Sequence, residues 1–381
     1  DVLGSRGLGD VYKRQYMYIV VFTSFIALLL TFLESKKIMP NGMRWGFVLV
    51  TFLGCIHYDY GNDYMAYMND YKIDTKYSFD LIGVVTDEYI KEPGWVLLSY
   101  LFKPIGGFFM MVAALNIFQN VIVYKTIKKY VEKSWWPMAV FIYLFSTCLY
   151  LLNFSMMRQG LVVCVFLWSW QWIVEKKWVK TVLVLLICVN IHKSAFFLLP
   201  FAFLGFIPMK NGKFLVLSII VVFASLWMMS SLMSDILLSL MVIEEVADYA
   251  MKYGDSTEVE TFGMGYVFGL IPFFLALRYL FFDKSEDGQG RKPLVALSVA
   301  PFLIDPFSSV IPLISRVSYY FIAYQILAFP VIYKYVNHYL LRYIFLFIYV
   351  LLILYTYLSF FSSPVWIGRY TVFKTIFSQI F

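Results

Sequence analysis

The sequence contains 381 residues, of which 61% are hydrophobic and only 14% are charged, and its mean hydropathy is +0.74. These values exclude an ordinary soluble globular protein and indicate a membrane protein. The net charge of +7 could indicate binding to nucleic acid. However, the sequence outside the apolar runs has no basic stripe with interleaved aromatic residues, so we predict no nucleic-acid partner.

The first segment of the chain, DVLGSRGLGDVYKRQ, differs in composition from everything that follows it. It contains no apolar run of the kind found in a signal peptide. We interpret residues 1–15 as a non-native leader and expect the native start near Met17. Residues 16–381 are predicted to form a single membrane domain.

Apolar runs suited to membrane-spanning helices follow one another along the chain. A bilayer core of about 30 Å requires about 20 helical residues, and the sequence has room for about twelve such helices. The prediction is therefore an all-α, multi-pass membrane protein. The approximate ranges are 16–33, 45–56, 106–124, 136–153, 158–174, 178–191, 195–208, 213–234, 263–282, 294–313, 317–335 and 343–362.

Lys and Arg residues are concentrated in alternate loops. The loops at 34–44, 125–133, 175–180, 208–213, 278–292 and 334–342 together carry 18 of the 31 Lys and Arg residues. Because cationic loops stay on the cytoplasmic side, these loops are predicted to be cytoplasmic. Both termini and the loops at 57–92 and 235–262 are then extracytoplasmic.

The two outer loops contain amphipathic stretches. Glu92, Pro93 and Gly94 mark a helix start, because Pro is tolerated in the first turn of a helix. The apolar residues that follow predict a helix lying in the membrane interface, and a similar helix is predicted in loop 235–262. Such helices commonly cover a site that faces lipid head groups.

Arg158 lies at the outer end of a predicted span, where the charge bias disfavours it. An Arg at the centre of a spanning helix costs about 2.5 to 3.5 kcal/mol, and less at the interface. One interpretation is an interfacial anchor. The other is an anion ligand beside a helix N-terminus.

His192 and Lys193 lie between two spans that are close enough to form a tight hairpin. A loop His with satisfied hydrogen bonds is one interpretation. Alternatively, the imidazole accepts a proton from a sugar hydroxyl or bonds a phosphate, and Lys193 adds positive potential.

The polar segment after the second span offers sugar-binding side chains. Gly61 and Asn62 predict a turn, and Asp63 either caps the helix that begins at Tyr64 or binds an acceptor hydroxyl. In the second interpretation the tyrosines stack on sugar rings. The candidate residues of this segment are His57, Asp59, Asp63 and Tyr64.

Asp305 lies in an apolar run that Pro301, Pro306 and Pro312 interrupt. The prolines predict a broken helix, whose irregular backbone is tolerated at membrane depth where it lines a cavity. Arg316 follows shortly afterwards. The two charged residues either form an ion pair or contribute to the polar site.

Several functional classes are excluded by missing motifs. The chain has no P-loop, and its four cysteines lack the spacing of a metal or redox site, so we predict no metal and no cofactor. No cytoplasmic segment is large enough to bind a nucleotide sugar. The substrate is therefore expected to arrive from the membrane or from the outer space, which fits a lipid-linked donor.

Five polar motifs occur in the order found in the EpsG family of Wzy-like exopolysaccharide polymerases, which the chain resembles from about Met17 onward. They are GNDYMAY, EPGWVLLSYLF, SMMRQGL, IHKSAFFLLP and ISRVSYYFIAY. At one position the chain departs from the pattern, since the family often has Arg where this sequence has His57.

The resemblance implies a GT-C-like glycosyltransferase of the bacterial cytoplasmic membrane. It would polymerise exopolysaccharide repeat units carried on undecaprenyl diphosphate at the extracytoplasmic face. Its implied partners are the lipid-linked oligosaccharide, membrane lipid, a chain-length regulator and other exopolysaccharide assembly proteins.

Site roles follow from the same resemblance. Arg158 and Arg316 would neutralise the diphosphate. Asp63 or His192 would accept the hydroxyl proton, with Asp63 slightly favoured and His192 assigned to the diphosphate side. Further candidates for substrate binding are Glu92, Gln159, Lys193 and Asp305.

Two other classes remain open at this point. A glycolipid flippase or transporter should carry polar residues near the middle of the membrane and two related halves, and no internal repeat is evident. A membrane acyltransferase that modifies polysaccharide is the second alternative, in which the His would face a buried acyl-donor channel.

Overall fold

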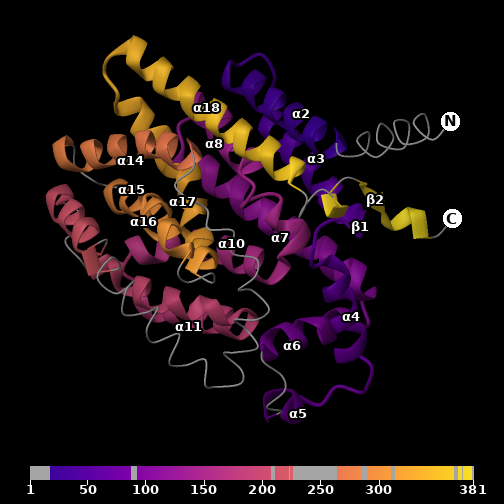
Figure 1. Ribbon diagram of the computed structural model, residues 1–381. Coiled ribbons are helices and arrows are strands. Elements are labelled where there is room, and N and C mark those ends of the chain that lie inside the picture. Colours follow the sequence, from indigo (N-terminus) through magenta and orange to yellow (C-terminus); the bar gives the residue numbers. More distant parts are fainter. Residues whose placement is uncertain are drawn as a thin grey trace, which may run out of the picture. The chain divides into compact units, whose positions relative to one another are not determined.

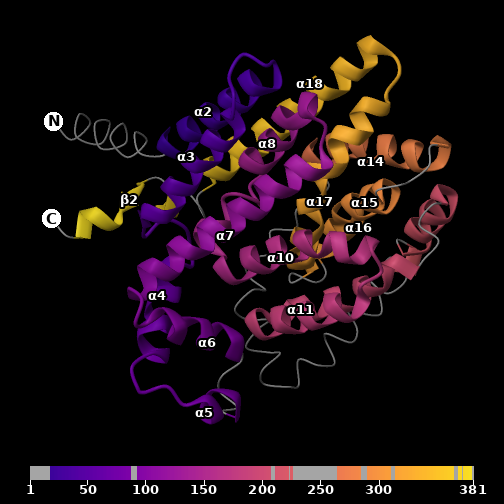
Figure 2. The same cartoon turned by 180° about the vertical axis from the view of Figure 1, so that it is seen from behind.

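A computed structural model of the chain shows a helical protein, seen from opposite sides in Figure 1 and Figure 2. It describes residues 18–86, 92–206, 211–222, 224–225, 264–284, 290–309, 314–363, 368–370 and 372–379. Contacts divide the chain into unit 1, comprising Asp1–Ala202 and Ile353–Phe381, and unit 2, comprising Phe203–Leu352. One short strand pair accompanies the helices in the described ranges, which confirms the all-α class. The single membrane domain stays a prediction.

Unit 1 contains most of the candidate site residues. Its longer helices are α2 (Tyr18–Ser35), α3 (Gly42–Ile56), α7 (Gly107–Tyr130), α8 (Trp136–Phe145), α10 (Met157–Val174) and α11 (Trp178–Ile191). Its short helices are α4 (Tyr64–Asp74), α5 (Leu81–Thr86), α6 (Pro93–Phe102), η1 (Lys133–Trp135), α9 (Leu152–Ser155) and η4 (Ile376–Gln379). The predicted helix after Glu92 is therefore present as α6.

Two predicted spans differ from the observed elements. The span at 136–153 is interrupted, because α8 ends at Phe145 and Ser146 adopts an extended conformation. The span at 195–208 is replaced by the 3-10 helix η2 (Lys193–Phe206), which contains Pro200. Proline has no N–H to donate within an α-helix, which accounts for a departure from regular α-helical bonding there.

The helices α3 and α7 pack side by side in opposite directions. Near the start of α3, the rings of Phe47 and Tyr124 lie 5.5 Å apart. Near its end, Gly54 approaches α7 so closely that a Cβ atom there would lie 2.3 Å from Asn116 Oδ1. A larger residue at Gly54 would therefore push the two helices apart.

Helix α7 carries three buried amide side chains, of which Asn120 bonds to a neighbouring segment. Asn116, Gln119 and Asn120 are each 1% exposed. The Tyr143 hydroxyl donates to Asn120 Oδ1 at 2.9 Å, and Asn153 Nδ2 donates to the Tyr143 oxygen at 3.2 Å. Because a buried polar group without a partner costs free energy, these bonds hold α7 against α8 and α8 against α9.

The cationic loops of unit 1 lie together at one end of its helices. Lys133 Nζ lies 3.7 Å from Glu34 Oε1, which brings loops 34–44 and 125–133 together. Lys129 Nζ donates to Gln171 Oε1 at 3.1 Å, which brings the last turns of α7 and α10 together. His57 follows the opposite end of α3. The grouping of the cationic loops at one end supports the prediction that they lie on one side of the membrane. That this side faces the cytoplasm stays a prediction.

A thiol-labelling experiment in intact cells tests that orientation. In a cysteine-free background, Asp70→Cys is expected to react with a membrane-impermeant thiol reagent, whereas Lys129→Cys should react only after the cells are opened. Both positions are exposed in the structure, so access within the protein does not limit either reaction. Labelling in the reverse sense would overturn the orientation.

A short strand pair joins distant parts of unit 1. The strands β1 (His57–Tyr58) and β2 (Lys374–Thr375) are antiparallel. Lys374 Nζ donates to Asp59 Oδ2 at 2.8 Å beside them. The predicted turn follows, and Gly61 adopts φ 106°, a backbone conformation that residues with a side chain rarely take.

Unit 2 is also helical. Its elements are a helix at Gly212–Val222, α14 (Met264–Phe282), α15 (Arg291–Ser298), α16 (Ala300–Ile304), η3 (Asp305–Ser309) and α17 (Ile314–Tyr335). The helix α18 (Tyr339–Ser362) continues from unit 2 into unit 1. The succession of α15, α16 and η3 confirms the predicted break. The leader 1–15 and the helix predicted in loop 235–262 lie outside the described residues.

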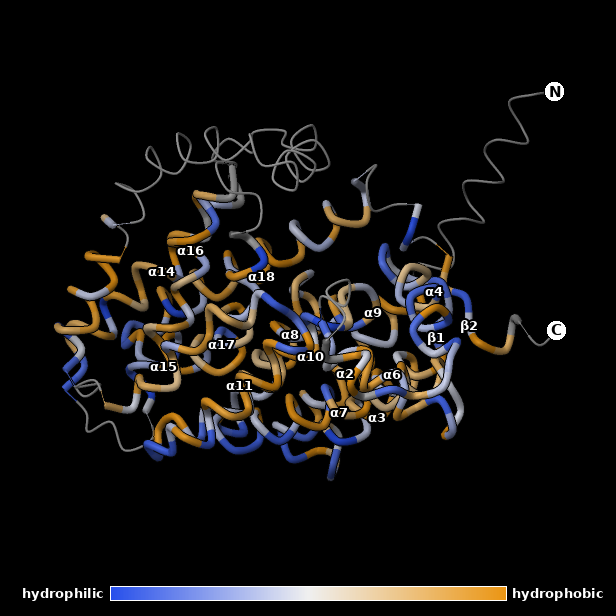
Figure 3. Tube along the Cα trace, turned by 90° about the horizontal axis from the view of Figure 1, so that it is seen from below, coloured by the Kyte–Doolittle hydropathy of each residue, from blue (hydrophilic) through white to orange (hydrophobic). Residues whose placement is uncertain are grey.

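Two helices in the described part of the chain, α7 and α18, are long and apolar enough to cross a membrane, judged by length and composition. Shorter apolar helices, including α3 and α11, accompany them. Most helical tubes in Figure 3 are predominantly orange, the colour of hydrophobic residues, with blue stretches between. These features indicate a membrane protein, and the number of twelve crossings stays a prediction.

Candidate functional site

Three chain segments meet around the carboxylate of Glu92. Glu92 directly precedes α6, Arg158 lies in the first turn of α10, and His192 follows the last residue of α11. Gly94 allows α6 to approach α11 closely, because a Cβ atom there would lie 3.0 Å from Asn190. The Glu-Pro-Gly sequence thus starts a helix and leaves room for the neighbouring chain.

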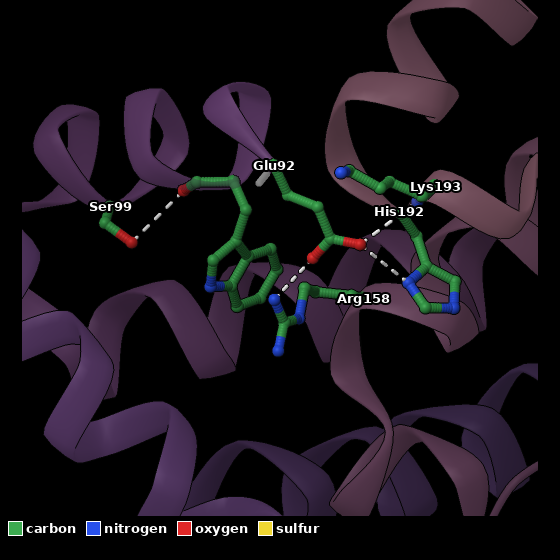
Figure 4. A network of polar contacts seen from close by, with 6 residues as sticks. Glu92, Ser99, Arg158, His192 and Lys193 are labelled. Atoms are coloured by element: carbon green, nitrogen blue, oxygen red, sulfur yellow. Dashed lines mark hydrogen bonds and ion pairs between the residues drawn. The ribbon is translucent and has the colours of Figure 1, made fainter. Parts of the chain in front are cut away.

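Figure 4 shows the Glu92 carboxylate between Arg158 and His192. Arg158 Nη1 donates to Glu92 Oε2. The other oxygen, Oε1, lies 3.0 Å from His192 Nδ1 and accepts the backbone N–H of Lys193 at 3.0 Å. The side chains are 12% exposed at Glu92, 16% at His192 and 29% at Arg158, so the network is largely withdrawn from solvent.

The contacts of Glu92 stabilise its ionised form. Burial alone would raise the pKa of Glu92, but the hydrogen bond from His192, the charge of Arg158 and the Lys193 N–H hold the pKa below its ordinary value of 4.5. A carboxylate can only accept hydrogen bonds, so His192 Nδ1 must carry the proton in this contact.

The second ring nitrogen of His192 is the unpaired group of the network. Nε2 is buried and has no hydrogen-bond partner within the described ranges. When Nδ1 carries the proton of a neutral imidazole, Nε2 has the free lone pair. The arrangement can therefore accept a proton at Nε2 once a local movement gives a substrate access to that atom.

Arg158 rests on two aromatic rings. Its guanidinium carbon lies 4.8 Å from the ring centre of Tyr67 and 5.9 Å from that of Trp95. Burial raises the pKa of the Tyr67 hydroxyl, and the charge of Arg158 opposes this shift. A cation over an aromatic face is attracted to it. Together with Glu92, the rings restrict where the guanidinium can point.

Asp63 directly precedes α4, the helix that carries Tyr67. Its backbone N–H donates to Ser155 Oγ at 3.3 Å, and its carbonyl accepts the N–H of Tyr67 at 2.9 Å. Asp63 occupies the N-cap position of α4 without a side-chain capping bond. The carboxylate thus does not act as the predicted cap, and its other predicted role is left open.

His57 and Tyr64 belong to the protein core. Both are 0% exposed, and their rings lie 5.0 Å apart at a steep angle. His57 Nδ1 lies 2.6 Å from the Gly54 carbonyl, and burial lowers the pKa of His57 to about 4. This burial favours packing over the predicted binding of a sugar by these two residues.

The remaining predicted residues divide between the two units. Gln159 is buried in α10, and Lys193 supplies its backbone N–H to Glu92. Asp305 begins η3 and Arg316 lies in α17, both in unit 2. Their participation in one site with Arg158 stays a prediction. Within the described ranges no three His, Cys, Asp or Glu side chains group together in a way that could hold a metal ion.

Sequence reasoning overlooked Tyr67 and Trp95 and assigned Glu92 to the substrate. Two signals in the sequence pointed to the roles of Tyr67 and Glu92. Tyr67 follows Asp63 by one helical turn, so the two share a face of α4. Glu92 and Arg158 are opposite charges predicted at the same membrane face, where each needs a partner.

A comparison with known protein families found a match. The model of the EpsG family matches residues 43–374, which include every residue of the Glu92 network. No curated protein and no solved structure matches the chain significantly.

Proposed function

The chain belongs to the EpsG family of Wzy-like polymerases, and on that premise we propose that it polymerises polysaccharide repeat units at the extracytoplasmic face of a bacterial membrane. The donor is a glycan carried on undecaprenyl diphosphate. The observation that supports this function is the Glu92 network, which places a fixed cation beside an imidazole with one free nitrogen.

The reaction requires a base and a site for a departing anion. A hydroxyl of the acceptor glycan attacks the anomeric carbon of the donor, so a new C–O bond forms while the bond to the diphosphate breaks. The hydroxyl proton passes to His192 Nε2, and undecaprenyl diphosphate leaves with the negative charge. Arg158 stabilises that charge with guanidinium N–H groups that Glu92 does not use.

His192 suits the role of base better than Asp63 does. Glu92 holds the His192 ring through Nδ1, which leaves Nε2 as the accepting atom. A carboxylate that orients a catalytic imidazole in this way also stabilises the cation formed by proton transfer. Glu92 is then a positioning residue, and the slight preference of the sequence prediction for Asp63 is reversed in this proposal.

The other residues have supporting roles in the proposal. Lys193 adds positive charge beside His192. A role for Arg316 as a second cation for the diphosphate stays a prediction from the family resemblance. Asp63 and Asp59 bind acceptor hydroxyls at the edge of the site, where Asp59 is held by Lys374.

Purified protein in vesicles with lipid-linked repeat units provides the direct test. The proposal expects longer glycans to form on the lipid carrier, whereas a flippase would move the repeat units across the bilayer without extending them. The buried amide of Asn120, near the middle of α7, accepts from the Tyr143 hydroxyl and donates to the Asn116 carbonyl, which favours a packing role over a transport path. Transfer of acyl groups without glycan extension would support the acyltransferase alternative.

Asp63→Asn separates the two candidate bases. If His192 is the base, the side-chain amide of this variant should still bind the acceptor hydroxyl in part. The extension rate should then fall by less than about 100-fold, which is the smallest loss typical of removing a general base. The measurement is the initial rate of glycan extension at saturating donor. A loss equal to that of His192→Ala would return the base role to Asp63.

A further inference from the structure

A groove of about 590 Å³ lies between α3 and α7, away from the Glu92 network. Residues of both helices line it along roughly three helical turns, from Arg44 to Cys55 on α3 and from Lys125 to Ile117 on α7. Because the helices are antiparallel, Arg44 and Lys125 mark the same end of the groove. That end adjoins the cationic loops 34–44 and 125–133.

In the described part of the chain, no acidic side chain pairs with the two cations at the charged end of the groove. Arg44 and Lys125 are both exposed, and within the described ranges neither forms an ion pair. The nearby acidic residue Glu34 is bound instead to Lys133 and to the backbone N–H of Met43. Two cations therefore remain available to an anion from outside the protein.

The walls of the groove are apolar and open outward. The exposed fractions are 49% at Val48, 58% at Phe52, 49% at Ile117 and 42% at Val121. Four uncharged polar side chains also line it, namely Thr51, Cys55, Asn120 and Tyr124. Three of them are already bonded: Asn120 bonds Tyr143 and the backbone of Asn116, Cys55 donates to the Ala113 carbonyl, and the Tyr124 hydroxyl accepts from Lys128. Because most of these polar groups already have partners and the exposed walls are apolar, a hydrocarbon chain fits this part of the groove.

We propose that the groove binds one anionic phospholipid from the leaflet beside the cationic loops. The lipid phosphate lies between Arg44 and Lys125, and one acyl chain lies along the apolar walls. Charge complementarity selects the lipid, because basic residues at a membrane surface attract anionic head groups within a short distance. The polymerase donor is not the occupant, since the cationic end lies opposite the end of α3 at which His57 and the outer segments begin. The proposal does not depend on the catalytic function.

Native mass spectrometry of the purified full chain tests this site. The protein is equilibrated with equal amounts of phosphatidylglycerol and phosphatidylcholine, and the ratio of the two bound lipids is measured. We expect wild-type protein to favour phosphatidylglycerol. Arg44→Gln/Lys125→Gln should lower that preference by roughly 30-fold, at about fivefold for each of the two basic residues that attract the anionic lipid.

Two further variants separate the groove from general surface charge. Lys36→Gln/Lys37→Gln removes two charges from the same loop region outside the groove and should keep the wild-type ratio. Val121→Trp retains both cations, but its larger side chain fills the space proposed for the acyl chain. It should therefore reduce binding of phosphatidylglycerol. An equal loss in the Lys36/Lys37 variant, or an unchanged ratio in the Arg44/Lys125 variant, would overturn the proposal.

Discussion

Arg158→Lys is expected to lower the rate of glycan extension about 100-fold or more, the range found when one preorganised donor to a developing negative charge is removed. Lysine keeps the positive charge but loses the planar fork that can bond Glu92 and a phosphate oxygen at the same time. It also loses the flat stacking on Tyr67 and Trp95. The measurement is the initial extension rate with purified protein and lipid-linked repeat units.

Arg278→Lys serves as the matched control. Arg278 lies in α14 with an exposed side chain, so this variant should extend glycans at the wild-type rate. Size-exclusion chromatography would establish that both variants remain folded. Full activity in Arg158→Lys would reduce Arg158 to an interfacial anchor and remove it from the catalytic machinery.

His192→Ala is expected to lower the extension rate by about 10² to 10⁴, the usual contribution of a general base. Glu92→Gln should also lower the rate, by up to about 10⁴-fold, because the amide no longer holds the ring in the required orientation and tautomer. The exposed His338 provides a control, and His338→Ala should retain activity. A fully active Glu92→Gln enzyme would contradict the positioning role.

The protonation state of His192 can be followed independently of activity. The chain has three histidines, so ¹⁵N-labelled histidine gives few signals, and His192→Gln identifies the one from His192. Wild-type protein should show the proton on Nδ1. In Glu92→Gln this preference should weaken, because a neutral amide can donate to Nδ1 as well as accept from it.

The acid range gives a second check on the same contact. The pKa of Glu92 lies below its ordinary value of 4.5, so the contribution of the network to stability is complete above that pH. It should be lost only as the pH falls through the lowered pKa. A ¹⁵N spectrum of His192 that already changes with Glu92 protonation well above pH 4.5 would contradict the assignment.

The sequence by itself determined the features that depend on local composition. Apolar runs predicted the helices, because hydrophobic side chains must leave water, and prolines predicted the break between α15 and η3 because they lack an N–H. The start of α6 at Pro93 followed from the same local rule. Polar residues that interrupt apolar runs identified Arg158, His192 and Glu92 as candidates, because charges at such places need a partner or a function.

Only the tertiary structure decided what each of these residues contacts. Glu92 and His192 are separated by 100 positions in the chain, and no local rule predicts that their side chains lie 3.0 Å apart. Local rules also do not predict that the Arg158 guanidinium packs on the Tyr67 ring, or that His57 and Tyr64 are buried in the core. The contacts of these side chains depend on which helix ends lie together. That arrangement is set by the packing of helices that are far apart in the sequence.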